Sequence, residues 1–153
     1  TRRISPEWFG QLNYDRSQRL DFRMVLGGGA RTAFASGEWG EFGMGASLVL
    51  EHEALNLAED ALHPINTSTL RWSSFLTLRV VPTEDFVITS TTYMQPKYDD
   101  FNDLRMLGKI RLATPVTDEL ALTISFNMRY DSGPPDGISA LDTTLRTGIT
   151  YAY

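Results

Sequence analysis

The stretch Leu120–Tyr130 reads LALTISFNMRY, and a second stretch, Thr143–Tyr153, reads TTLRTGITYAY. In both, large apolar side chains alternate with small or polar ones. A period of two that persists over about ten residues predicts a β-strand whose two faces have different surroundings. The segment between them, DSGPPDGISALD at 131–142, is rich in Gly, Pro and Asp and predicts a loop. The two stretches are therefore a predicted antiparallel hairpin with one apolar face.

Length and composition narrow the class of protein. The 153 residues predict a single domain over 1–153. A net charge of −5 and a pI near 5.0 give no reason to expect a nucleic-acid partner. The absence of cysteine removes disulfides, thiol nucleophiles and cysteine metal sites. No apolar run approaches the roughly 20 residues of a membrane helix, whereas a mean hydropathy of −0.21 is compatible with alternating membrane strands.

The same alternation recurs along the chain and predicts eight strands and no helix. The predicted strands cover 8–14, 19–34, 41–51, 70–80, 86–95, 104–113, 120–130 and 144–153. The connections alternate in length. Those on one side are short, at 35–39, 82–85 and 115–119, and two of those on the other side are long, at 15–18, 55–67, 96–101 and 131–142. Short turns on one side and longer loops on the other are typical of membrane β-barrels.

Charge separates the two faces of the predicted strands. The apolar alternate positions of all eight strands contain no Asp, Glu, Lys or Arg. The opposite faces carry many charges, mostly Arg among Gly, Ser, Thr and Asn, and Lys occurs only at 97 and 109. A soluble barrel gives the same alternation, but its exposed face is usually rich in Lys and Glu. The pattern favours an all-β, antiparallel up-and-down transmembrane β-barrel with about eight strands in this chain.

Aromatic residues near the ends of the apolar faces support a membrane location. Two bands of amphipathic rings at the two interfaces form the aromatic girdles of a membrane barrel. The predicted girdle comprises Trp8, Tyr14, Trp72, Tyr130, Tyr151 and Tyr153.

Strand pairing predicts a row of interior charges. Pairing the second and third strands brings Arg23 near Glu51, and pairing the third and fourth brings Glu51 near Arg71, with Glu53 and Asp21 adjacent. The full predicted interior network is Arg23, Glu51, Arg71, Arg79, Arg105, Lys109, Arg111, Arg129 and Arg146. Its simplest role is mutual neutralisation of buried charge. A constriction that selects ions is the alternative, and the excess of arginine would then favour anions.

No catalytic, cofactor or metal site is predicted. The two histidines, His52 and His63, lie near Ser68 and several carboxylates at one rim, so a lipid hydrolase or acyltransferase stays a distant alternative. The triplet Gly27–Gly29 lies within a strand and is followed by no helix, which argues against a phosphate loop. We expect these glycines to allow sharp curvature or the close packing of an interior arginine.

Several local motifs resemble one family. They are Gln95-Pro96 with Asp99–Arg105 (DDFNDLR), Thr117–Leu120 (TDEL), Tyr130–Pro135 (YDSGPP) with Asp142-Thr143, and, less specifically, Arg19–Arg23 (RLDFR) with Gly27–Gly29. In these the chain resembles the salt-induced outer-membrane proteins, domain of unknown function 481, most strongly in its C-terminal half. The resemblance implies a porin-like barrel in the outer membrane of a Gram-negative bacterium. It implies no activity.

The resemblance also implies partners. They are membrane lipid and lipopolysaccharide, and the barrel-assembly machinery, which would read the terminal Tyr153. The loops are candidate contacts for a protein partner or a second copy. Family members are usually longer at the N-terminus, so two arrangements stay open: a barrel that closes with eight strands, and the C-terminal part of a longer barrel.

The expected function is a structural or stress-related outer-membrane barrel with a polar, arginine-rich interior and external loops. A small, weakly anion-selective channel is the alternative.

Overall fold

The computed structural model describes residues 4–16, 19–57, 62–83 and 85–151. It contains eight β-strands, as the alternation predicts. They are β1 (Ile4–Asp15), β2 (Leu20–Gly37), β3 (Gly40–Leu55), β4 (Asn66–Thr83), β5 (Phe86–Pro96), β6 (Leu104–Pro115), β7 (Leu120–Asp131) and β8 (Leu141–Tyr151). Each strand pairs antiparallel with its sequence neighbour in one sheet, in the order β1 to β8. The up-and-down topology is confirmed.

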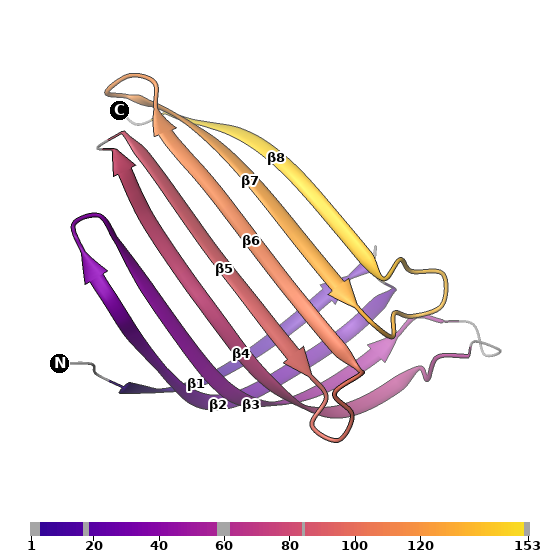
Figure 1. Cartoon of the computed structure of the whole chain (residues 1–153). Coiled ribbons are helices and arrows are strands. Elements are labelled where there is room, and N and C mark those ends of the chain that lie inside the picture. Colours follow the sequence, from indigo (N-terminus) through magenta and orange to yellow (C-terminus); the bar gives the residue numbers. More distant parts are fainter. Residues whose placement is uncertain (1–3, 17–18, 58–61, 84, 152–153) are drawn as a thin grey trace.

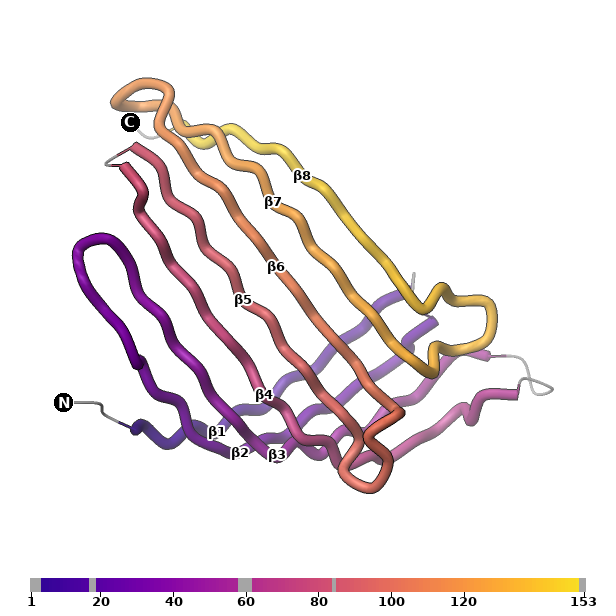
Figure 2. Tube along the Cα trace, in the orientation of Figure 1, coloured from indigo at the N-terminus to yellow at the C-terminus, as the bar shows by residue number. Residues whose placement is uncertain are grey.

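The three longest connections lie at one end of the sheet, together with the short connection from β1 to β2 (Figures 1 and 2). Short turns join β2 to β3, β4 to β5 and β6 to β7 at one end, where β1 also begins and β8 ends. The opposite end, here called the loop end, carries the connections 56–65, 97–103 and 132–140. At the loop end the backbone N–H of His63 donates to Asp136 Oδ2 at 2.9 Å, which ties two of these loops together.

The sheet is strongly curved, so that it has a concave inward face and a convex outward face (Figure 1). Its hydrogen-bonded ladders run from β1 through to β8, and within the described ranges no ladder joins β8 back to β1. Two strand edges therefore have no strand partner in this part of the chain.

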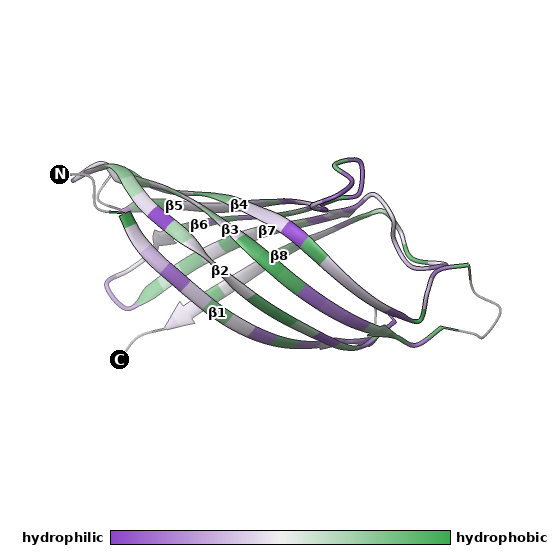
Figure 3. Cartoon of the chain, turned by 90° about the horizontal axis from the view of Figure 1, so that it is seen from below, coloured by the Kyte–Doolittle hydropathy of each residue, from purple (hydrophilic) through white to green (hydrophobic). Residues whose placement is uncertain are grey.

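The two faces of the sheet differ as the sequence predicts. The convex, outward face is apolar and exposed, and Figure 3 shows hydrophobic residues alternating with hydrophilic ones along the strands. Trp8 is 83% exposed, Leu145 67% and Ile149 70%. Such values are unusual for so many large apolar side chains on one continuous surface of a water-soluble monomer. The inward face contains the buried charges. No helix in the described ranges is long and apolar enough to cross a membrane.

One local prediction is wrong because of a β-bulge. The alternation of the sequence predicts Leu20 on the apolar outward face, with Phe22 and Met24, and Asp21 beside the interior charges. The register shifts between Leu20 and Phe22, so Leu20 turns inward and is buried, while Asp21 is exposed and accepts a hydrogen bond from Asn56 Nδ2 at 3.3 Å. A bulge reverses the facing of the residues beyond it, and nothing in the alternation of the sequence marks its position.

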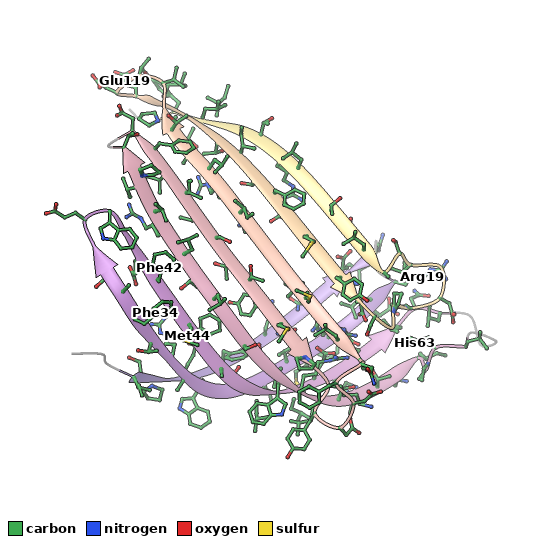
Figure 4. All side chains as sticks on the ribbon, viewed as in Figure 1. Arg19, Phe34, Phe42, Met44, His63 and Glu119 are labelled. Atoms are coloured by element: carbon green, nitrogen blue, oxygen red, sulfur yellow. The ribbon has the colours of Figure 1, made fainter. Side chains whose placement is uncertain are left out.

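Two inward-facing strand glycines lie against aromatic rings. A Cβ added at Gly27 would lie 2.3 Å from the Phe9 ring, and one at Gly45 would lie 2.3 Å from the Phe75 ring. No arginine lies among the atoms nearest to a Cβ at Gly27, so of the two expected roles the close packing of an arginine is not seen at this position. A further aromatic group lies at the turn end. The rings of Phe34 and Phe42 (Figure 4) have centroids 5.9 Å apart, and the Trp39 ring lies 5.6 Å from that of Phe42.

Candidate functional site: an interior ion-pair cluster and a basic wall

The most buried charges lie on the inward face near the loop end. The register places Arg23 of β2 opposite Glu53 of β3, two residues from Glu51. The side chain of Glu51 is only 2% exposed and lies between three arginines. Arg23 Nη2 and Arg105 Nη1 each donate to one of its carboxylate oxygens, and Arg71 Nε lies 3.8 Å from Oε1. Glu51 is the centre of the cluster.

Arg105 connects the cluster across the interior. Its Nη1 and Nη2 donate to the two Glu53 oxygens at 3.0 and 2.9 Å, and its Nε donates to Asp131 Oδ2 at 2.7 Å. β3 and β6 are three strands apart, which is roughly 14 Å in a flat sheet. The contact between Arg105 and the two glutamates therefore depends on the curvature of the sheet.

Arg71 is anchored by the loop between β5 and β6. Its Nη2 donates to Asp103 Oδ1 at 2.9 Å, and its Nη1 donates to the carbonyls of Gln95 and Asp103 at 3.2 and 3.3 Å. Within the part of the chain that the structure describes, two buried nitrogens, Arg23 Nε and Arg71 Nε, have no hydrogen-bond partner.

The charges of the cluster nearly balance. We define the ion-pair cluster as Arg23, Glu51, Glu53, Arg71, Asp103, Arg105 and Asp131. Three arginines face four carboxylates. A cavity of about 40 Å³ beside the cluster is lined by Arg23, Arg105 and also Arg129, which adds a fourth positive charge. Breaking a buried ion pair is strongly destabilising, because it leaves a charge without compensation. The arrangement fixes the geometry of the interior at this end.

The structure thus brings together the predicted row Arg23–Glu51–Arg71, with Glu53 beside it. Two members of the cluster, Asp103 and Asp131, were placed in loops by the sequence. The contact of Asp131 with Arg105 could have been predicted, because pairing β6 with β7 across their short turn places the two residues opposite each other. Asp103 gave no such signal, since it lies outside the strands.

The other predicted basic residues lie elsewhere on the inward face. In the described ranges no ion pair is formed by Arg79, Lys109, Arg111 or Arg146, and all four are exposed. They do not join the ion-pair cluster. Their side chains face the open interior from strands β4, β6 and β8.

These four residues belong to what we call the basic wall. It is the inward face of β4–β8 between the short turns and the register position where Arg129 of β7 lies opposite Asp142 of β8. The inward strand positions of this region contain no acidic residue. Arg79, Arg111 and Arg146 lie in one register row, separated by Thr89 and Ser125. The row meets Glu41 at its β3 end, opposite Arg79, with no ion pair between them.

Between the ion-pair cluster and the basic wall the interior is hollow. A cavity of about 370 Å³ is lined by aromatic and aliphatic side chains, by amides and hydroxyls, and by the charged Glu7 and Arg23. Phe75 and Tyr93 contact each other there at 5.4 Å between ring centroids, and Gln95 Nε2 donates to Ser73 Oγ at 3.1 Å. The interior of this sheet is not filled by side chains.

The residues proposed for a hydrolase are divided between the two faces. His52 Nδ1 lies 2.9 Å from Ser68 Oγ on the outward face of β3 and β4. Glu51 and Glu53 point inward into the cluster, and His63 contacts the carbonyl of Pro64. Among the described residues, no hydrogen bond or ion pair joins a carboxylate to His52 and Ser68. In the described ranges no group of three or more His, Asp or Glu is arranged to hold a metal ion.

Five of the six predicted girdle residues can be located. Trp8, Tyr14, Trp72 and Tyr151 are exposed, and Tyr130 is partly buried. Trp72 stacks on Tyr98 of the loop between β5 and β6, with ring centroids 5.9 Å apart. Tyr151 also donates its hydroxyl to Glu119 at 3.1 Å at the turn end. Tyr153 lies outside the described residues, so its predicted role in assembly stays a prediction.

Comparison with known proteins finds one family. The model described as "Protein of unknown function, DUF481" matches residues 2–153. No curated protein and no solved structure matches this chain.

Proposed function

We propose, for a chain that belongs to the DUF481 family, a function as a β-barrel protein of the bacterial outer membrane with a structural or stress-related role. In this proposal the curved sheet is a lipid-embedded wall, the ion-pair cluster fixes its interior, and the loops face the outside. Lipid and lipopolysaccharide would surround the wall.

The observation that carries the proposal is the division of the two faces. Large apolar side chains are exposed over the whole convex face, whereas Glu51, Arg71 and Asp131 are buried on the concave face. A water-soluble protein gains stability by the opposite arrangement, because burial of apolar surface drives its folding. A lipid environment makes the observed arrangement favourable.

The proposal requires that the edges of β1 and β8 be paired in the membrane. Unpaired backbone N–H and C=O groups cost several kcal/mol each in hydrocarbon, so membrane sheets are closed. An eight-stranded barrel is just wide enough for side chains to fill it, whereas this interior retains cavities. Closure by pairing of β1 with β8 and closure by further strands both stay open.

We expect the protein to fractionate with outer membranes and to need detergent for extraction. A closed barrel in detergent resists unfolding at room temperature, so an unheated sample should migrate differently on a denaturing gel from a boiled one. Both properties can be measured on membranes from cells that express the chain. A protein that is soluble without detergent and shows no such shift would contradict the membrane assignment.

Anion-selective conduction is the second candidate, and the basic wall favours it. Positive side chains that line a pore attract anions and repel cations. Arg79, Lys109, Arg111 and Arg146 are exposed to the interior with no acidic residue on the same wall.

If the barrel conducts, we expect a reversal potential under a KCl gradient that shows a preference for chloride. The variant carrying Arg111→Gln and Arg146→Gln should lose part of that preference, and Arg16→Gln, in the loop after β1, should keep it. Single channels in planar bilayers give the measurement. A cation-selective pore, or no conductance at all, would rule this candidate out and leave the structural role.

A further inference from the structure

We propose that the basic wall is a binding site for a linear, phosphate-rich polyanion. The site comprises Arg79, Arg111 and Arg146, with Lys109 beside the row. The inference rests on the proposed function only in requiring that water reach the inward face, and it does not require conduction.

The spacing of the arginines selects an extended ligand. Arg79, Arg111 and Arg146 share one register row on β4, β6 and β8, the alternate strands of the wall. Neighbouring strands are about 4.8 Å apart, so successive arginines in the row are separated by roughly 10 Å. The backbone positions of the three arginines thus extend over roughly 20 Å along the row. A chain of linked phosphates can contact several arginines of such a row at once.

The chemistry of the row suits phosphate. The planar guanidinium presents paired donors that match the oxygens of a phosphate group. Thr89 and Ser125, which separate the arginines, add hydroxyl donors in the same row. The adjacent row supplies Thr91, Lys109, Asn127 and Thr144. All of these groups can donate a hydrogen bond to a phosphate oxygen.

The cations of the basic wall differ from the arginines of the ion-pair cluster in their carboxylate partners. In the cluster every arginine has at least one carboxylate within 4.0 Å. On the basic wall, within the described ranges, none of the four cations forms an ion pair, although each is exposed. Uncompensated like charges on one surface repel each other, and a polyanion relieves that repulsion. A structural role alone does not explain their placement.

The test is a calorimetric titration of the folded full chain with tripolyphosphate, inorganic phosphate and a neutral oligosaccharide. We expect tripolyphosphate to bind at least about tenfold more tightly than phosphate, because linked groups bind together. Binding should weaken steeply as salt is added. The neutral oligosaccharide should not bind. Equal affinity for phosphate and tripolyphosphate would overturn the proposal.

Variants assign the binding to the row. The double variant Arg111→Gln with Arg146→Gln should lower the affinity for tripolyphosphate by about tenfold for each arginine removed. Arg111→Lys with Arg146→Lys preserves the charge and should retain part of the affinity, and this pair replaces the glutamine variants if they fail to fold. Arg16→Gln is the matched control and should bind as the unchanged chain does. Unchanged affinity in both double variants would overturn the proposal.

This test is independent of the proposed function. The titration is carried out in detergent if the protein is a membrane barrel and in plain buffer if it is soluble. A soluble chain that binds tripolyphosphate through the row would refute the membrane assignment and leave the site standing. A membrane barrel that fails to bind tripolyphosphate would leave the membrane assignment standing and refute the binding site.

Discussion

Glu51→Gln is expected to destabilise the folded protein by about 3–5 kcal/mol, the cost of removing one partner from a buried ion pair. Glutamine preserves the shape of the side chain and removes its charge. Arg23, Arg71 and Arg105 would then share fewer carboxylates in a region where Glu51 is only 2% exposed. Urea-induced unfolding in lipid vesicles, followed by tryptophan fluorescence, measures the change in the free energy of unfolding.

Glu41→Gln is the matched control. Glu41 lies on the same strand and the same inward face, but it is exposed and forms no ion pair in the described ranges. We expect Glu41→Gln to lower the free energy of unfolding only slightly. Adding Arg23→Gln to Glu51→Gln should restore part of the stability, because the two residues interact directly. A loss below about 1 kcal/mol for Glu51→Gln, the range of exposed pairs, would show that the cluster is open to water.

Phe126→Arg is expected to destabilise the inserted protein by about 2–4 kcal/mol, the cost of a lipid-facing arginine near the middle of the bilayer. Phe126 lies near the middle of β7, on the outward face, and is exposed. Its side chain therefore faces hydrocarbon if the sheet spans the membrane. Folding into lipid vesicles at a series of urea concentrations measures the effect.

Asn127→Arg provides the comparison on the opposite face. Asn127 is the next residue along β7 and lines an interior cavity with Lys109 and Thr144. A charge there remains in water, so we expect a much smaller loss than for Phe126→Arg. If the inward substitution proved the more costly of the two, the assignment of the lipid face would be reversed.

Much of the fold was predictable because strand facing is a local property. Side chains of a strand alternate strictly between two faces, so the absence of charge from one set of positions identifies that face from the sequence alone. Short turns then fix the register of β2 with β3, of β4 with β5 and of β6 with β7. The pairs Arg23 with Glu51 and Glu51 with Arg71 lie on adjacent strands, and for that reason the sequence was sufficient to place them together.

The sequence was insufficient where a contact crosses non-adjacent strands. Arg105 reaches Glu51 and Glu53 only because the sheet curves. Curvature comes from the twist and bulges of all eight strands together, and no local pattern encodes it. The same limit explains Leu20, whose facing is reversed by a bulge.

The division of the basic residues follows the same rule. From the sequence alone, nine inward charges formed one set. The tertiary structure separates them, because Glu51 and Glu53 of β3, Asp131 of β7 and Asp103 of the loop after β5 converge at the loop end, and the inward strand positions of the basic wall contain no acid. The sequence by itself determined the eight strands, their order and which face is apolar, since these depend on neighbouring residues. Only the tertiary structure decided which arginines are neutralised, since that depends on how far the sheet bends.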